Sequence, residues 1–454
     1  MSVLNSAPEK TLMKTYKIYI IPAIILLLAG LGWWFFNTLG EWEEPQIKLS
    51  HDIKAIGRRS PLDISFADGK SGLRQTTVSI SQNDRTSVLS SVNHTGKTTN
   101  QKTISVVIDP IALKLHDGPA VLTITAVDQA LWKNTATISR VISIDVIPPQ
   151  VFLLTPTNHI NPGGACMVLY RTSKPVISTG IKVDDAPFSA YPISISGKPC
   201  YIAYFTLPLD VSKSGGNIKI FAKDQGGNET LAAVPRLILK KKYRSDKMSL
   251  SDHFLHQKMP EFLPLNPALR DKPPIEIFTY VNTTLREENF KTIQAICSKS
   301  EAKQLWQDTF LRMKDASPMA QFGDKRTYVY QGKVIGDSVH MGVDLASLAN
   351  AAIEAANHGT VVFTGPLGIY GNTVIIDHGY GLYTLYAHLS NIKVGNGQGV
   401  KRGETIGSSG LTGLAGGDHL HFSVIVGGQF VDPKEWWDAH WIADNVTKKM
   451  AVSF

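Results

Sequence analysis

The chain has 454 residues, more than one ordinary domain, and at roughly 150 residues each it has room for about three domains. Its composition, 43% apolar and 19% charged, is that of a folded globular protein, which excludes long disorder outside the N-terminus and linkers. The net charge of +8 suits contact with anionic surfaces such as phospholipid, cell-wall polymer or nucleic acid. The basic residues are scattered apart from a run at 240–244, and nucleic acid is not among the partners that we expect.

Residues 18–36 form an apolar run without a charge, IYIIPAIILLLAGLGWWFF. At about 1.5 Å per residue such a helix is roughly 28 Å long, close to the hydrocarbon thickness of a bilayer. Lysines precede the run and glutamates follow it, so the positive-inside bias predicts that residues 1–17 stay in the cytoplasm. We therefore expect a transmembrane helix at 18–36 and a single-pass protein of the inner membrane, with its C-terminal bulk in the periplasm or otherwise outside the cytoplasm. The alternative is a cleaved signal peptide, because Ala29 and Gly30 are small.

Residues 44–241 have the pattern of short strands separated by turns. TTVSIS and TISVVID carry apolar residues at every second position and are bounded by Asn, Asp, Gly or Pro. A repeat relates LTITAVDQALWKN to IKIFAKDQGGN, in which Asp128 and Asp224 correspond at a period of 96 residues. This period is the size of an immunoglobulin-like sandwich, and the repeat resembles bacterial immunoglobulin-like repeats. The sequence predicts two such domains, 44–147 and 148–241.

The chain has three cysteines, and an exported protein would meet an oxidising compartment that permits disulfides. Cys166 and Cys200 fall in the same predicted β-domain, and we expect them to pair. The odd count leaves one thiol, and we expect Cys297 to be buried and inert. The alternative is three free, buried thiols.

Between residues 242 and 320 the apolar period changes from that of strands to that of helices. Thr284 and Glu287 have the spacing of a capping box, and Phe290 and Ile293 follow at a helical interval. We expect a short helical connector whose apolar face belongs to the core.

The last third of the chain returns to strands with dense glycine and contains the most informative residues. His340 and Asp344 are four residues apart in HMGVDLA, His388 lies in LYAHLS, and His419 and His421 lie in GDHLHF. Because successive side chains of a strand alternate between faces, His419 and His421 should point the same way. Imidazole and carboxylate are ligands that zinc takes in tetrahedral sites, so the pattern predicts a metal site.

These motifs resemble the lysostaphin-type (LytM-like) zinc endopeptidases, which cut peptide cross-bridges of peptidoglycan. The resemblance also includes GIYGNTVIIDHGYGLYTLYAHLS and VKRGETIGSSGLTG. It implies that one zinc ion per chain is bound by three residues and that two histidines do the acid–base work. The implied zinc ligands are His340, Asp344 and His421, and the implied acid–base residues are His388 and His419.

The same stretch predicts the fold of this region. Short strands, hairpin turns at HGYG, NGQG and GGQF, and few helical patterns indicate an antiparallel β-sheet with a groove lined by glycine-rich loops. The chain as a whole is then mainly β. Its predicted order is a membrane helix, two immunoglobulin-like sandwiches, a helical connector, a metallopeptidase domain at 321–439 and a C-terminal tail at 440–454.

Three protein ligands, one of them anionic, leave the fourth zinc position for water, as a catalytic site requires. The sequence therefore predicts a zinc-dependent peptidoglycan endopeptidase in which two histidines assist a zinc-activated water. The expected partners are peptidoglycan stem peptides, the membrane and a possible protein regulator. Two alternatives stay open: a catalytically inactive relative that acts as a scaffold for other cell-wall hydrolases, and an adhesion protein that works through its immunoglobulin-like pair.

Other polar residues of this region are expected to be structural. His378 lies in a hairpin turn, and His358 and His440 have no partner at ligand spacing. Tyr386 should share a face of its strand with His388, and we expect it to pack at an edge, with a substrate contact as the alternative.

Overall fold

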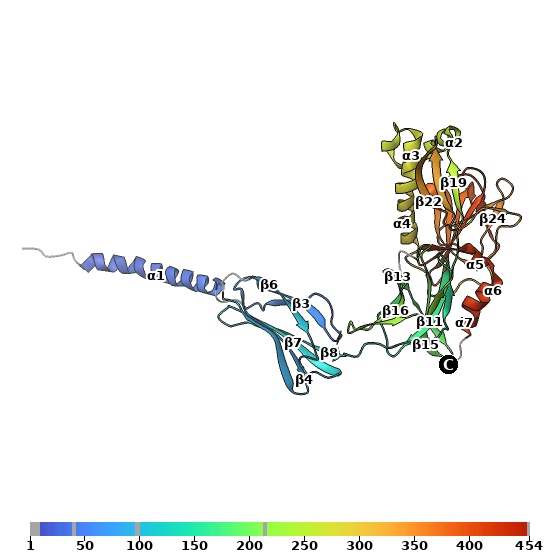
Figure 1. Ribbon diagram of the computed structural model, residues 1–454. Coiled ribbons are helices and arrows are strands. Elements are labelled where there is room, and N and C mark those ends of the chain that lie inside the picture. Colours follow the sequence, from blue (N-terminus) through green and yellow to red (C-terminus); the bar gives the residue numbers. More distant parts are fainter. Residues whose placement is uncertain (1–9, 39–41, 96–99, 212–215, 452–454) are drawn as a thin grey trace, which may run out of the picture. The chain divides into compact units, whose positions relative to one another are not determined.

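Strands predominate in the computed structural model, so the chain is mainly β as the sequence predicts. The structure describes residues 10–38, 42–95, 100–211 and 216–451 (Figure 1). Residues 1–9 of the predicted cytoplasmic segment and 452–454 of the predicted tail lie outside this part of the chain. The chain divides into two units, one formed by 1–148 with 224–228 and the other by 149–223 with 229–454.

Helix α1 (Lys10–Thr38) covers the apolar run near the N-terminus and contains Pro22. A membrane span needs both length and sustained apolar character. Among the residues that the structure describes, no helix has enough of both to cross a membrane. The predicted transmembrane helix at 18–36 is therefore wrong, and so is the single-pass location in the inner membrane that depends on it.

The first unit contains two sheets that share one apolar core. Strand β3 (Ser60–Ala67) shows the alternation that builds this core, because it buries Leu62, Ile64 and Phe66 and exposes the residues between them. The smaller sheet has the order β1 (Gln46–Leu49), β3 (Ser60–Ala67), β6 (Gln101–Ile108). The larger sheet has the order β2 (Ala55–Ile56), β8 (Thr135–Ile144), β7 (Gly118–Asp128), β4 (Leu73–Gln82), β5 (Arg85–Asn93).

The second unit begins with two four-stranded sheets and a parallel strand pair. One sheet has the order β14 (Tyr191–Ile195), β15 (Lys198–Thr206), β11 (Ala165–Thr172), β9 (Val151–Leu153). The other has the order β13 (Ala186–Ser189), β12 (Ser178–Val183), β16 (Ile218–Lys223), β17 (Glu229–Ala233). The parallel pair is β10 (Asn158–Ile160) with β18 (Arg236–Ile238).

The sequence repeat corresponds to one turn that occurs twice. Asn134 Nδ2 donates to Asp128 Oδ2 over 2.7 Å, and Asn228 Nδ2 donates to Asp224 Oδ2 over 2.9 Å. In both turns the aspartate N–H also donates to the asparagine carbonyl, over 3.1 Å. The repeat therefore corresponds to a hydrogen-bonded Asp–Asn turn at the end of β7 and after β16, with the two residues six positions apart in the first turn and four in the second.

The predicted disulfide is wrong, because Cys166, Cys200 and Cys297 are all free, buried thiols. Cys166 on β11 lies opposite Phe205 of β15, whereas Cys200 lies five residues earlier on β15. At about 3.4 Å per residue, this separates the two cysteines by roughly 17 Å along the strand, far beyond the reach of a disulfide.

The segment predicted to be a helical connector is helical only between residues 252 and 296. It begins with strand β19 (Ser245–Ser249), which pairs in parallel with β21 (Lys325–Tyr330), and β21 pairs with β22 (Lys333–Val339). The predicted capping box at Thr284 does not start a helix, because helical turns run without a break from residue 274 to 296. The helical elements are α2 (Asp252–Lys258), η1 (Met259–Leu265), η2 (Pro267–Leu269), α3 (Pro274–Tyr280), the π-helical turn η3 (Val281–Leu285) and α4 (Arg286–Ile296).

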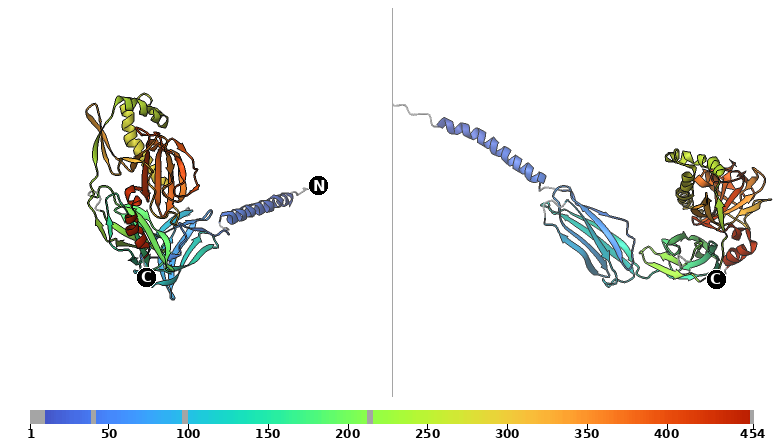
Figure 2. Two further views of the ribbon diagram at one scale, coloured as in Figure 1. Left: turned by 90° about the vertical axis from the view of Figure 1, so that its right-hand side faces the viewer. Right: turned by 45° about the horizontal axis from the view of Figure 1, so that its top comes forward.

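The C-terminal region is built on an antiparallel sheet, as predicted, and Figure 2 shows its strands side by side. Its order is β20 (Ser317–Ala320), β23 (Val343–Ala346), β31 (Leu420–Val426), β27 (Leu382–Leu389), β26 (Asn372–Gly379), β25 (Gly359–Pro366), β29 (Gly399–Val400), and β32 (Gln429–Val431) also pairs with β31. A smaller sheet has the order β24 (Ala352–Glu354), β30 (Thr405–Ser408), β28 (Asn391–Ile392), and the short helix η4 (Gly368–Tyr370) precedes β26.

The predicted C-terminal tail is helical over its described residues and completes a core that the whole second unit shares. Its helical elements are α6 (Ala439–Ile442), the π-helical η5 (Ala443–Thr447) and α7 (Lys448–Met450), and α5 (Pro433–Trp437) comes just before them. Trp436 is fully buried, with its ring 6.0 Å from that of Tyr204 on β15 and 5.4 Å from that of Phe310. The β-domain and the C-terminal sheet therefore pack as one body.

Glu435 is a buried acid at this junction. Its Oε2 accepts a hydrogen bond of 2.7 Å from the N–H of Ala165 on β11. Burial raises the pKa of Glu435 to about 7, against the opposing effect of the Ala165 N–H. The unfolded chain releases this proton near pH 4.5, whereas the folded chain keeps it until about pH 7. The free energy of unfolding therefore falls as the pH rises through this window.

We predict that Glu435→Gln removes this loss of stability, because the amide stays neutral and can still accept from Ala165. The variant should be more stable than the wild type at pH 8 by about 3 kcal/mol, the free energy that corresponds to the rise of the Glu435 pKa from 4.5 to about 7. Near pH 4 the two proteins should be equally stable. Thermal unfolding across this range measures the effect, with Glu288→Gln on the exposed face of α4 as control. Parallel stability curves for wild type and Glu435→Gln would contradict the prediction.

Candidate metal centre

Three predicted residues meet on the face of the C-terminal sheet. Asp344 on β23 lies directly opposite His421 on β31, so the antiparallel register places their side chains together. His340 comes from the turn before β23 and closes the group. Asp344 Oδ1 lies 2.9 Å from His340 Nε2 and 2.9 Å from His421 Nδ1, and the two nitrogens are 3.0 Å apart. All three side chains are buried, and their donor atoms are close enough to hold one metal ion.

In each of the two histidines, one ring nitrogen is hydrogen-bonded on the side away from Asp344, and the other nitrogen faces Asp344. His340 Nδ1 lies 3.0 Å from the carbonyl oxygen of Gln321, which makes Nδ1 the protonated donor. His421 Nε2 lies 3.0 Å from Ser423 Oγ, whose own hydroxyl donates to the carbonyl of Met341 over 2.9 Å. Each ring therefore directs a lone pair inward, the arrangement of metal-binding histidines.

Gly342, between the two ligand positions of HMGVDLA, is required by this packing. A Cβ there would lie 2.6 Å from His421 Nε2 and 2.6 Å from Ser423 Oγ. Any larger residue would push the histidine off its serine.

The electrostatics favour the forms that bind metal. Burial acts to raise the pKa of Asp344, but its contacts with His340, His419 and His421 prevail and hold that pKa well below its usual range. Burial lowers the pKa of His421 to about 4. Asp344 is therefore a carboxylate and His421 a neutral imidazole at neutral pH. The outer carboxylate oxygen of Asp344 accepts from the guanidinium of Arg326 over 3.3 Å.

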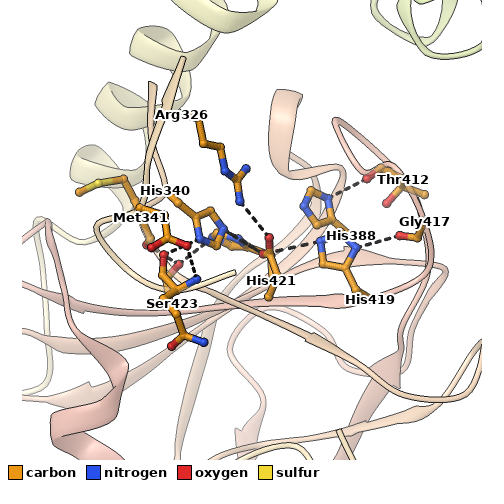
Figure 3. Close-up of polar contacts among 12 residues, drawn as sticks. Arg326, His340, Met341, His388, Thr412, Gly417, His419, His421 and Ser423 are labelled. Atoms are coloured by element: carbon orange, nitrogen blue, oxygen red, sulfur yellow. Dashed lines mark hydrogen bonds and ion pairs between the residues drawn. The ribbon is translucent and has the colours of Figure 1, made fainter. Parts of the chain in front are cut away.

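The other two predicted histidines lie beside this group, as Figure 3 shows. The rings of His388 and His419 are 4.8 Å apart, and His419 Nε2 is 3.6 Å from Asp344 Oδ1. His419 and His421 thus contact the same carboxylate, which confirms that they point the same way. Burial holds the pKa of His388 well below its usual range, whereas Asp344 outweighs burial and raises the pKa of His419.

One glycine-rich loop, residues 409–417, orients both of these histidines. His388 Nδ1 donates to the carbonyl of Thr412 over 2.8 Å, and His419 Nδ1 donates to the carbonyl of Gly417 over 2.8 Å. His388 also has a positive φ of 63°, a conformation that costs energy for a residue with a Cβ. Each ring therefore leaves its Nε2 available toward the metal group.

Lys258 at the end of helix α2 fixes the same loop from the other side. Its ammonium group is buried and donates to the carboxylate of Glu261, at 2.9 Å and 3.1 Å, and to the carbonyl of Leu411. Leu411 directly precedes Thr412, the residue that holds His388. No local sequence pattern predicts this contact, because the lysine and Leu411 are 153 residues apart.

A groove of about 530 Å³ passes over the metal group. One wall comes from the C-terminal sheet region and includes Tyr370 and Leu414, while the other includes Met248, Leu250 and Phe254 of the β19–α2 segment. The segment predicted to be only a connector thus forms part of the site. Tyr386, in contrast, is buried and lines a different cavity, of about 820 Å³, that includes Phe422 and none of the five predicted site residues.

The remaining histidines stay outside the centre. Both ring nitrogens of His378 are used, Nδ1 by the carbonyl of His358 and Nε2 by the hydroxyl of Thr384, each at 2.7 Å. His358 accepts from the N–H of Arg402, and His440 is exposed on α6. None of the three belongs to the metal group.

Comparison with known proteins defines the class of this region. Residues 338–433, which contain all five site residues, match the family described as Peptidase family M23. The chain thus has a C-terminal M23 peptidase domain, in agreement with the resemblance seen in its motifs.

Individual relatives match over the same domain. The chain is 42% identical over 95 residues to the DD-carboxypeptidase/endopeptidase Mpg of Neisseria meningitidis serogroup B, covering 21% of this chain and 22% of that protein. It is 43% identical over 93 residues to the peptidoglycan DD-endopeptidase ShyA of Vibrio cholerae, covering 20% and 22%. The chain therefore matches about a fifth of the length of these relatives. Among solved structures, the catalytic domain of lysostaphin from Staphylococcus simulans is 28% identical, with 27% of this chain and 92% of that chain covered and a TM-score of 0.23.

The hydrogen bond between Ser423 and His421 leads to a prediction about metal affinity. Ser423→Ala removes the acceptor that holds the outer nitrogen of His421, so the dissociation constant for zinc should rise about 10- to 100-fold. Calorimetric titration of the chelator-treated chain with zinc measures it, and Ser347→Ala, a hydroxyl on a surface loop, is the control. Unchanged zinc affinity in Ser423→Ala would show that the serine does not support the ligand.

Proposed function

We propose that this chain is a zinc-dependent endopeptidase that hydrolyses peptide cross-links of peptidoglycan. The observation that carries the proposal is the convergence of His340, Asp344 and His421 on one point, with His388 and His419 beside it in an open groove. The match to the M23 family and the names of two relatives, a DD-carboxypeptidase/endopeptidase and a peptidoglycan DD-endopeptidase, support a peptide bond of peptidoglycan as the target.

The three converging residues fit zinc by their chemistry. Two neutral imidazole nitrogens and one carboxylate oxygen are a usual ligand set for a catalytic zinc, which keeps a further position open. Zinc bound there would supply a water molecule that ionises near neutral pH and a Lewis acid for the scissile carbonyl. Arg326 and Ser423 hold the ligands in place through their outer atoms.

His388 and His419 are the residues of the chain that can handle protons beside this centre. Because His388 Nδ1 keeps its proton and donates it in a hydrogen bond to the carbonyl of Thr412, Nε2 has a lone pair that can accept a proton from the attacking water. His419 directs Nε2 toward Asp344 and the groove, where it can donate to the departing amine or to the oxygen of the scissile carbonyl. The ring of His388 lies 4.8 Å from that of His419 and 5.8 Å from that of His421, so both acid–base candidates can reach one scissile bond.

The β-domains that precede the catalytic region are proposed to be the immunoglobulin-like pair expected from the sequence. The first domain has two sheets that enclose their own apolar core, separate from the core of the second unit. The second packs on the C-terminal sheet through Trp436 and Glu435, so it stabilises the catalytic region directly.

Five single alanine variants test the assignment of roles. His340→Ala, Asp344→Ala and His421→Ala each remove one of three protein ligands, so zinc content and peptidoglycan hydrolysis should fall together. His388→Ala and His419→Ala keep all three ligands, so zinc should stay near one per chain while the turnover rate falls about 100-fold or more. Digestion of purified peptidoglycan with mass analysis of the products, and metal analysis of the same samples, measure both quantities.

Two outcomes would overturn this assignment. A wild-type chain that binds zinc but releases no peptides would indicate the alternative of an inactive scaffold. A His419→Ala chain that has lost its zinc, or still cuts at the full rate, would show that this histidine has another role.

Lys258 should act as a positioning residue through the loop at 409–417. Lys258→Met removes the contact with Leu411 and keeps the aliphatic stem, so kcat should fall about tenfold while KM and zinc content stay within twofold. Lys258→Arg should recover part of the rate, and Lys272→Met, which only breaks an exposed pair with Glu276, should have no effect. A fall in zinc content or an unchanged kcat in Lys258→Met would contradict this role.

A further inference from the structure

The groove extends beyond the metal group toward helix α4. The ring of Tyr370 lies 5.6 Å from that of His421. Next to it, a second cavity of about 320 Å³ shares Arg286, Met341 and Tyr370 with the groove. A peptide bound across the metal group can therefore continue over Tyr370 and past Arg286.

Arg286 is held in a fixed position by neutral groups. It is half-buried, its Nε donates to the carbonyl of Asn282 over 3.3 Å, and its Nη2 donates to Asn282 Oδ1 over 3.1 Å. Asn282 is itself buried in the π-helical turn η3, and its Nδ2 donates to the carbonyl of Asp337. π-Helical turns are frequent at functional sites.

The guanidinium of Arg286 has no carboxylate to balance it. None of the ion pairs between described residues includes Arg286, and the neighbouring Glu287 pairs with Lys291 over 2.7 Å instead. Asp344 is the one acidic residue among the described lining of the groove, and Glu287 is the one that lines the second cavity. Asp344 is engaged by imidazoles and Arg326, and Lys291 balances the charge of Glu287. This end of the groove therefore carries an uncompensated positive charge.

We propose that Arg286 binds a carboxylate of the substrate, so that the preferred substrates are extended peptides with a free carboxylate on the Tyr370 side of the scissile bond. This inference rests on the proposed endopeptidase function. The planar guanidinium can give two parallel hydrogen bonds to a carboxylate, and such charge-assisted pairs are roughly twice as strong as neutral ones. Tyr370 and Met341 supply an apolar surface for the chain between the metal group and Arg286.

The test compares two cross-linked stem peptides that differ only at the terminal carboxyl group, free in one and amidated in the other. Wild-type protein should cleave the acid form with a KM about tenfold or more below that of the amide. Arg286→Gln should raise KM for the acid form to the value for the amide, with kcat within twofold, and should leave KM for the amide unchanged. Arg286→Lys, which keeps the charge but loses the planar fork, should lie between them.

Binding provides a second measurement that does not depend on turnover. Analogues of both peptides with the scissile amide reduced to an amine should show the same preference in calorimetric titrations, and the preference should disappear in Arg286→Gln. Arg312→Gln, a loss of the same charge at the other cavity, is the matched control and should change nothing.

The outcomes separate the two proposals. Equal effects of Arg286→Gln on the acid and the amide, or no preference in the wild type, would overturn the carboxylate site and leave the endopeptidase intact. A wild-type chain that neither binds nor cleaves either peptide would overturn the proposed function, and the carboxylate site with it.

Discussion

The structure of the site depends on one buried carboxylate. Asp344 is surrounded by three imidazoles and a guanidinium, and a charge in such a place is costly unless every neighbour compensates it. The register of β23 and β31 puts His421 opposite Asp344, and the turn before β23 adds His340. The donor atoms of these three side chains are close enough to hold one metal ion, as the proposed function requires. The strand pairing thus brings the proposed ligands together before any acid–base residue is considered.

Segments distant in sequence fix the two histidines that lie beside this carboxylate. His388 and His419 depend on carbonyl groups of one glycine-rich loop, and that loop depends on Lys258 in a helix far away in sequence. The strained backbone of His388 is maintained only because its neighbours over-determine it. A buried ammonium group that donates to one carboxylate and one carbonyl is a strong constraint, since breaking it would leave the charge unpaired.

The sequence predicted those features that depend on neighbouring residues, namely the alternation of side chains along strands and the hydrogen-bonded turns between them. The alternation around His419 and His421 fixed their common face, the turns at HGYG and GGQF gave the antiparallel sheet, and the repeat at Asp128 marked a real hydrogen-bonded turn. The sequence does not reveal how strands pair in register. Cys166 and Cys200 lie on neighbouring strands of one sheet, but they are five residues apart along the strand direction. The strand β19 was missed because its partner β21 begins 80 residues later, and the apolar run near the N-terminus suggested a membrane span that the structure does not support.

The segment that matches the M23 family is not an independent module in this protein. Its sheet gains β20 from before the segment, its groove takes a wall from β19 and α2, and Trp436 joins it to the core of the preceding β-domain. A fragment of residues 338–433 alone would keep the proposed ligands. It would expose the apolar surface that now packs on the preceding β-domain, and it would lose the contact between Lys258 and the loop at 409–417. The side chains that support the proposed site therefore come from much of the second structural unit, well beyond the segment that matches the family.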